Sequence, residues 1–176
     1  MSFRIITATL LALALSACGE QSVEQETASQ SADTSQSAEA REPQAQTLTV
    51  YKSPTCGCCE DWIVHLEEKG FQTTAEHPDD MRTKKTELNI APQYGSCHTG
   101  VSESGYVFEG HVPAKLVQQF LDNPPENALG LAVPRMPVGS PGMEMGDRFD
   151  PYDVLLLKTD GSSEVYARIE QPEQQY

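Results

Sequence analysis

The sequence predicts a mixed α/β (α+β) domain over residues 47–170, built on one sheet. Strand-like and helix-like runs alternate along this stretch. A cluster of three cysteines, Cys56, Cys58 and Cys59, stands where the first strand run gives way to the first helical run. About 125 residues are enough for one hydrophobic core. We therefore expect a single domain whose chemistry is concentrated at that first turn.

The first half of the domain has the pattern of a strand, a helix and a second strand. Residues 48–51 form a short apolar run of strand type. Apolar residues then recur at i, i+3, i+4 and i+7 from Cys59 to Leu66, and Gly70 ends this helix. Residues 71–75 form the second strand. Because a helix connects the two strands, we expect them to be parallel.

A hairpin and two further helices follow. Residues 83–88 favour a short helix, and the strand runs 96–101 and 106–109 surround a turn sequence typical of an antiparallel hairpin. Pro113 stands at the first turn of a predicted helix that continues to Leu121. The order strand, helix, strand, helix, hairpin, helix, with Cys-x-x-Cys at the first turn, is that of a thioredoxin-like domain.

The rest of the chain contains a loop and a second hairpin. Residues 134–146 are so rich in proline and glycine that regular structure is excluded there. The methionines of this loop are Met136, Met143 and Met145. They are either loop hydrophobes or thioether ligands, which select Cu(I), and Met143 is the favoured ligand. Residues 152–158 and 164–169 form the hairpin, and residues 171–176 are a tail.

The N-terminus predicts a lipoprotein. Residues 1–17 have a charged start, a short apolar run and small residues, as a signal peptide does. Leu15-Ser16-Ala17-Cys18 resembles a lipobox, so we expect a lipid on Cys18. The alternative, a membrane helix, would need about 20 apolar residues. Because Gly19 rather than aspartate follows, we expect a periplasmic protein anchored to the outer membrane.

Residues 18–46 are expected to be a disordered linker between this lipid anchor and the domain. They are rich in Gln, Ser, Glu and Thr and show no apolar periodicity. The whole chain has a formal net charge of −14. Such a balance argues against nucleic acid as a partner and suits a domain that handles cations.

Cys56 and Cys59 have the spacing of a redox pair. At a helix N-terminus a thiol pKa can fall from about 8.5 to roughly 3.5–7.5, and the thiolate is both a nucleophile and a soft metal ligand. Cys58 is a third thiol, which either competes for disulfides or widens the site into a metal cradle. Two functions remain open: copper binding, and thiol–disulfide exchange with Cys56 and Cys59 as catalytic residues.

Other candidate ligands stand further along the chain. Cys97 and His98 begin the predicted hairpin strand, which passes beside the redox turn in thioredoxin-like folds, and His111 precedes a helix. We expect His65 and His77 at the surface. Thiolates with imidazole and thioether favour copper over a structural zinc. The candidate metal ligands are Cys56, Cys58, Cys59, Cys97, His98, His111 and Met143.

Residues 51–167 resemble the CopG family of bacterial copper-resistance proteins. The blocks that carry the resemblance are residues 53–59, 96–99, 109–113 and 139–144. The resemblance implies a periplasmic thioredoxin-like domain whose cysteines, with a nearby histidine and methionine, hold several copper ions. It also implies cycling between Cu(I) and Cu(II), and other periplasmic copper-handling proteins as partners.

Overall fold

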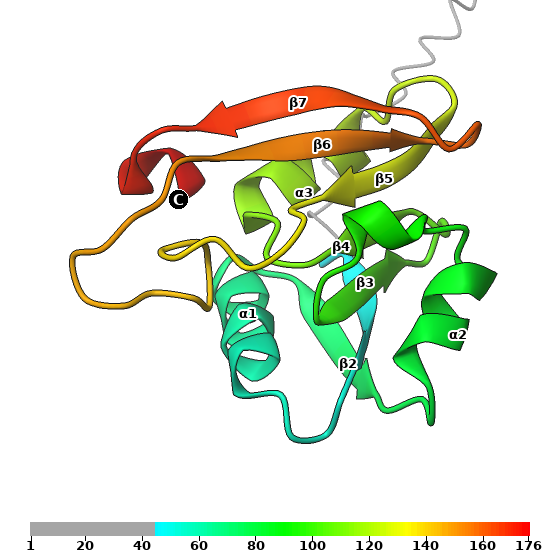
Figure 1. The fold of residues 1–176 in the computed structure, drawn as a ribbon, viewed down its shortest axis with the longest axis horizontal. Coiled ribbons are helices and arrows are strands. Elements are labelled where there is room, and N and C mark those ends of the chain that lie inside the picture. Colours follow the sequence, from blue (N-terminus) through cyan, green and yellow to red (C-terminus); the bar gives the residue numbers. More distant parts are fainter. Residues whose placement is uncertain (1–44) are drawn as a thin grey trace, which may run out of the picture. The chain divides into compact units, whose positions relative to one another are not determined.

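The computed structural model describes residues 45–176 (Figure 1). The predicted signal peptide, the lipidation site Cys18 and all but the last two residues of the predicted linker lie outside the described residues. Within residues 45–176, none of the helices combines the length and the apolar character that a membrane crossing requires.

One seven-stranded mixed sheet runs through the domain, in the order β2-β1-β3-β4-β5-β6-β7. Its strands are β1 (Thr47–Lys52), β2 (Gln72–Glu76), β3 (His98–Ser102), β4 (Val107–Glu109), β5 (Ala128–Ala132), β6 (Tyr152–Lys158) and β7 (Ser163–Ile169). The α-helices are α1 (Gly57–Glu68), α2 (Met81–Glu87) and α3 (Ala114–Asp122). Two 3-10 helices, η1 (Pro92–Tyr94) and η2 (Pro172–Gln175), complete the elements.

The first four strands have the predicted thioredoxin-like arrangement. β1 and β2 are parallel, with the crossover helix α1 between them, and β3 runs antiparallel to both β1 and β4. The mixed α/β fold class is therefore confirmed. Alternate residues of β1 are buried because successive side chains of a strand point to opposite faces of the sheet, and Leu48 and Val50 face the apolar core.

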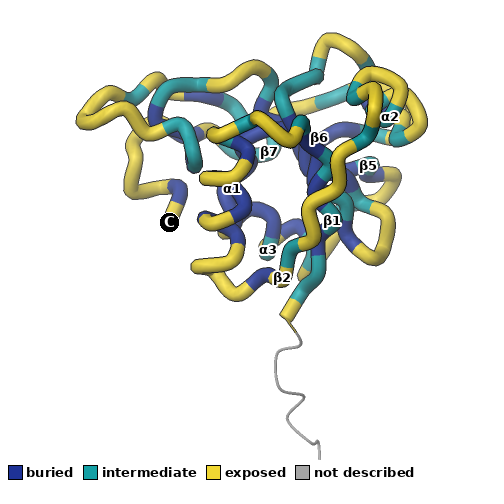
Figure 2. Tube along the Cα trace, turned by 90° about the horizontal axis from the view of Figure 1, so that it is seen from below, coloured by how far each residue is buried: buried dark blue, intermediate teal, exposed yellow. Residues whose placement is uncertain are grey.

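Helices cover the sheet on both faces. Trp62 and Leu66 of α1 and Phe120 of α3 share one apolar core with Phe108 of the sheet, so α1 and α3 lie on the same side (Figure 1). On the other side, Ile90 after α2 joins a smaller cluster with strand residues. The helix α2 itself buries no residue and is exposed or half-exposed along its length (Figure 2).

Strand β5 was not predicted from the sequence. It pairs in parallel with β4 and antiparallel with β6, and so joins the thioredoxin-like part to the last hairpin in one sheet. Its sequence, Ala-Leu-Gly-Leu-Ala, lacks the β-branched and aromatic residues that mark strands. Gly130 is needed at its centre, because a Cβ there would overlap the carbonyl group of Val107 on β4.

The loop between β5 and β6 returns to the start of α1. A Cβ added to Gly142 would lie 2.7 Å from the backbone nitrogen of Trp62 and 2.9 Å from the carbonyl oxygen of Cys58. The φ angle of Gly142 is +81°, a conformation that also favours glycine. Residues 171–176, taken from the sequence as a tail, fold back as η2 and bury Gln175.

The prediction that His65 lies at the surface was wrong. Its side chain is 6% exposed, and its Nε2 accepts a hydrogen bond from the backbone N–H of Ala114 at 3.0 Å. The reason lies in α3, whose N-cap residue is Pro113 and offers no side-chain acceptor to the first turn. His65 supplies that acceptor from α1. His77 is exposed, as predicted.

Candidate metal centre

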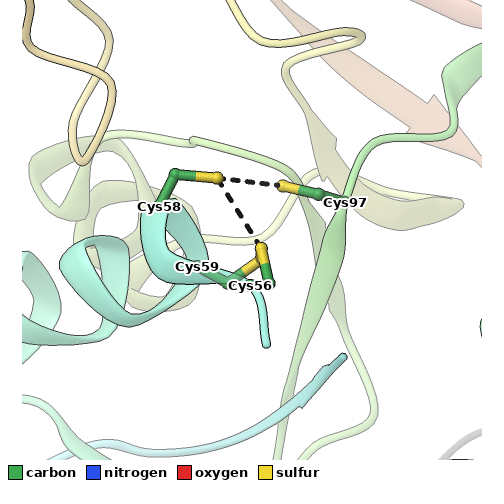
Figure 3. Close-up of side chains that lie close together, drawn as sticks. All are labelled: Cys56, Cys58, Cys59 and Cys97. Atoms are coloured by element: carbon green, nitrogen blue, oxygen red, sulfur yellow. Dashed lines mark hydrogen bonds between the residues drawn. A yellow bond between two sulfur atoms is a disulfide. The ribbon is translucent and has the colours of Figure 1, made fainter. Parts of the chain in front are cut away.

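The cysteine turn forms the start of α1. Cys56 is the N-cap residue of the helix, and its N–H donates to the carbonyl oxygen of Ser53 at 3.2 Å, which closes the turn after β1. Cys58 and Cys59 then fall in the first helical turn. Cys56 and Cys59 are joined as a disulfide, whereas Cys58 and Cys97 are free thiols (Figure 3).

Cys97 lies directly across from this turn. Its sulfur is 4.0 Å from that of Cys58, and the Cys58 sulfur is 3.6 Å from that of Cys56 (Figure 3). All four sulfur atoms lie within 4.8 Å of one another. The proximity of the Cys97 segment to the redox turn agrees with the expectation from the fold, because β3 pairs with β1 and Cys97 immediately precedes β3.

Two histidines extend the cluster beyond Cys97. The Cys97 sulfur is 3.2 Å from Nδ1 of His98 and 3.4 Å from Nε2 of His111. The other ring nitrogen of His111, Nδ1, lies 2.8 Å from the carbonyl oxygen of Pro141. A carbonyl can only accept, so Nδ1 carries the proton and Nε2 keeps a lone pair directed at Cys97.

Burial controls the protonation of these groups. It raises the pKa of the Cys97 thiol to about 11, and the neighbouring Cys58 adds to the effect. The same desolvation lowers the pKa of both His98 and His111. At neutral pH Cys97 is therefore a protonated thiol, and both imidazoles are neutral. A metal ion bound here would have to displace the Cys97 proton, whereas a neutral imidazole needs to lose no proton before it coordinates.

The structure brings the backbone beside Met143 to the cysteine turn, because its neighbour Gly142 packs on Trp62 and Cys58. Met143 is half-buried. The side chains of Met136 and Met145 are 48% and 53% exposed. Of the three loop methionines, Met143 is thus the one whose position suits a ligand role.

Sequence reasoning missed Glu109, whose side chain is fully buried. Its carboxylate accepts hydrogen bonds from the backbone N–H of Ser96, from Lys85 Nζ and from the Thr99 hydroxyl. It therefore anchors the backbone immediately before Cys97. The sequence feature that could have pointed to Glu109 is its position directly after the apolar pair Val107-Phe108.

Two solved forms of a protein titled copper resistance protein CopG are each 44% identical to this chain, with a TM-score of 0.68. The matches cover 72% and 73% of this chain and 99% and 100% of the two CopG chains. The chain belongs to the CopG family.

A second match falls on the same region of this CopG family member. The family model described as protein of unknown function, DUF411, matches residues 94–143. This span includes Cys97, His98, His111 and Met143, so it contains the face of the cluster opposite the cysteine turn. The search of curated proteins finds no match.

Proposed function

We propose that this CopG family member is a periplasmic copper-binding protein of copper resistance and homeostasis, which holds more than one copper ion. The observation that carries the proposal is the cluster of four sulfur atoms within 4.8 Å of one another, with two imidazole nitrogens beside Cys97. The printed names of the two similar structures, both copper resistance proteins, support the same metal.

The donor set fits copper better than zinc. Soft thiolates select Cu(I), and imidazole also suits Cu(II), whereas a structural zinc is satisfied by four ligands. Six Cys and His side chains converge here, and Met143 lies on the adjoining loop. Cys56 and Cys59 become ligands once an external thiol reductant delivers two electrons and two protons to their disulfide and is itself oxidised to a disulfide; the two new thiols then release their protons as the metal binds.

Redox cycling is part of the proposal. Each bound Cu(I) ion loses one electron to an external one-electron acceptor and becomes Cu(II), and the reverse step takes the electron back. Thiolates stabilise Cu(I), and the neutral rings of His98 and His111 offer nitrogen donors suited to Cu(II). A mixed shell of this kind keeps the metal in both oxidation states.

We propose the location from the N-terminal sequence pattern. Lipidation at Cys18 would tether the domain to the outer membrane through residues 18–46. We expect Cys18→Ser to release or mislocalise the protein, measured by cell fractionation. A Cys18→Ser protein that remains as firmly membrane-bound as wild type would remove the anchor from this account.

Metal loading tests the centre itself. The reduced protein, loaded with Cu(I) without oxygen, should hold more than one ion, and Cys58→Ser or Cys97→Ser should lose most of that capacity. His77→Ala is a matched control, because His77 is exposed and lies outside the cluster. Displacement of Cu(I) by an equal concentration of Zn(II) would overturn the assignment of copper.

Oxidation of the loaded protein tests the cycling. After addition of ferricyanide, the Cu(II) signal in electron paramagnetic resonance should grow while the thiol count stays constant. His98→Ala should keep Cu(I) loading but retain less Cu(II). If instead the thiols form disulfides and all copper leaves as Cu(I), redox cycling of bound copper is refuted.

The Cys56–Cys59 disulfide favours a second candidate, a thiol–disulfide oxidoreductase acting on protein disulfides. In that function an external thiol reductant first reduces the pair; Cys56 then attacks a substrate disulfide, and Cys59 resolves the mixed disulfide, which releases the reduced substrate and re-forms the Cys56–Cys59 disulfide. Reduction of insulin that requires Cys56 and Cys59 but tolerates Cys58→Ser and Met143→Leu would support it. Absence of insulin reduction in the wild-type protein would exclude it.

A further inference from the structure

The segment after β7, residues 170–176, is attached to the loop that carries Met143. Its Gln175 is only 1% exposed, so both ends of the amide need partners. Nε2 of Gln175 donates to the carbonyl oxygen of Gly139 at 3.0 Å, and Oε1 accepts from the hydroxyl of the buried Tyr152. Gln175 therefore links the start of β6 to the loop.

Gly139 belongs to a closed turn, residues 139–143. Its N–H donates to the carbonyl oxygen of Met143 at 2.8 Å, and the Met143 N–H donates to the carbonyl oxygen of Ser140 at 2.7 Å. Because these bonds make the turn a unit, the hydrogen bond from Gln175 to Gly139 restrains Met143 as well.

The same turn contacts the candidate metal centre twice. The carbonyl oxygen of Pro141 accepts from Nδ1 of His111, which leaves Nε2 of His111 directed at Cys97. Gly142 lies against the backbone of Cys58 and Trp62. Displacement of the turn would therefore break the bond that orients the His111 ring and would open the packing over the cysteines.

Tyr176 adds a contact on the far side of the turn. Its hydroxyl is 3.1 Å from the Glu144 carboxylate, and its ring lies edge-on to His65 with centroids 5.7 Å apart. The ammonium group of Lys69 is 5.6 Å from the centre of the same ring. Residues 170–176 thus bridge the Met143 loop and α1.

We propose that residues 170–176 form a strap that holds the 139–143 turn against the metal centre, with Gln175 as its positioning residue. The strap sets the orientation of His111 and the place of Met143. Its relevance to copper rests on the proposed function, but its geometry belongs to the metal-free protein and can be tested there.

Nuclear magnetic resonance of the metal-free protein tests the geometry. In Gln175→Leu the amides of Gly139 and Met143 should exchange with solvent about tenfold faster or more, because the turn loses its restraint. The ring nitrogens of His111 should shift from the Nδ1–H form towards a mixture of tautomers. Tyr152→Phe removes the partner that holds Oε1 of Gln175 and so loosens the amide that bonds to Gly139; it should produce a smaller change in the same direction.

Glu173→Ala is the matched control, because Glu173 is an exposed residue of the same 3-10 helix. It should leave both measurements unchanged. Wild-type exchange rates and His111 signals in Gln175→Leu would overturn the strap. If Gln175→Leu does not fold, Tyr152→Phe decides: no change at Gly139 or His111 would overturn it equally.

Copper release tests the link to the site. Transfer of Cu(I) to a colorimetric chelator should be about tenfold faster from Gln175→Leu than from wild type. Adding Gln175→Leu to His111→Ala and Met143→Leu should change the rate little, because the positioned groups are already gone. Equal rates in wild type and Gln175→Leu would refute the role in copper retention. A wild type that takes up no Cu(I) would refute the proposed function instead, and the metal-free measurements would stand.

Discussion

Single side chains in this fold can belong to one element and hydrogen-bond to another. His65 lies on α1 but satisfies the first turn of α3, through the bond from the Ala114 N–H to Nε2. Only the neutral ring can accept that bond, because both nitrogens of a protonated imidazole are donors. Burial lowers the pKa of His65 to about 4, with Glu144 opposing this effect and Lys69 adding to it. His65 therefore ties the stability of the domain to pH.

The sign of this dependence follows from linkage. The unfolded chain binds a proton at His65 near its ordinary pKa of 6.5, whereas the folded protein does so only near pH 4. Stability from this group is full above pH 6.5 and is lost as the pH falls towards 4. Between pH 7 and 4.5 we expect the protein to lose about 2 kcal/mol of folding stability from this group, a value that already includes a reduction for partial solvation of the ring.

The variant His65→Gln isolates this contribution, because a glutamine oxygen can accept from Ala114 without titrating. Urea unfolding at pH 7 and 4.5 should show about 2 kcal/mol less acid destabilisation in His65→Gln than in wild type. His98 and His111 titrate in both proteins, so their effects cancel. Identical pH dependence in the two proteins would contradict the role of His65.

At the scale of elements, α2, β3 and β4 meet in one buried polar network. Glu109 on β4 is fully buried and pairs with Lys85 of α2, which is 13% exposed. It also binds the hydroxyl of Thr99 on β3 and the backbone N–H of Ser96. Each of these donors has the Glu109 carboxylate as its acceptor. The bond to the Ser96 N–H therefore holds the Cys97 segment beside the cysteine turn.

Glu109→Gln should destabilise the protein by about 2–4 kcal/mol, because the new amide N–H₂ faces donors and Lys85 loses its partner. Glu164→Gln is the control: its ion pair with Lys158 is exposed, and we expect a cost below about 1 kcal/mol. Both can be measured by urea unfolding at neutral pH. Equal costs for the two variants would show that the network does not hold the elements together.

At the scale of the whole described domain, β5 unites two parts of the chain. It pairs with β4 of the thioredoxin-like part and with β6 of the last hairpin, and the Met143 loop leaves from its end. The two parts can be one sheet only if β4 and β5 approach closely at Gly130, where a side chain would meet the Val107 backbone. We expect the fold to depend on this glycine.

Gly130→Ala should cost more than about 4 kcal/mol, because a neighbouring strand backbone cannot move aside without breaking its ladder. Gly161→Ala is the comparison: Gly161 has φ +84° but open space around it, so only backbone strain of about 1–2 kcal/mol is expected. Thermal unfolding followed by circular dichroism measures both. Similar melting temperatures for the two variants would refute the close approach.

Much of the fold could be predicted from local patterns. The first strand, its crossover helix and the parallel second strand appear within one or two residues of their expected positions, because apolar spacing and glycine stops act locally. The proximity of Cys97 to the cysteine turn also followed from the sequence, since the order of elements predicts which strand neighbours β1. The ligand roles of these residues stay predictions.

The sequence by itself determined the type and order of the α-helices and of every strand except β5, together with the cysteine turn, because those depend on neighbours along the chain. Only the tertiary structure decided what β5, His65, Glu109 and Gln175 do. Each of these pairs with a group far away in sequence, such as Ala114 for His65 or Gly139 for Gln175. A polar residue does not reveal from its own surroundings whether a distant donor or acceptor will bury it, since that burial depends on how the whole chain packs.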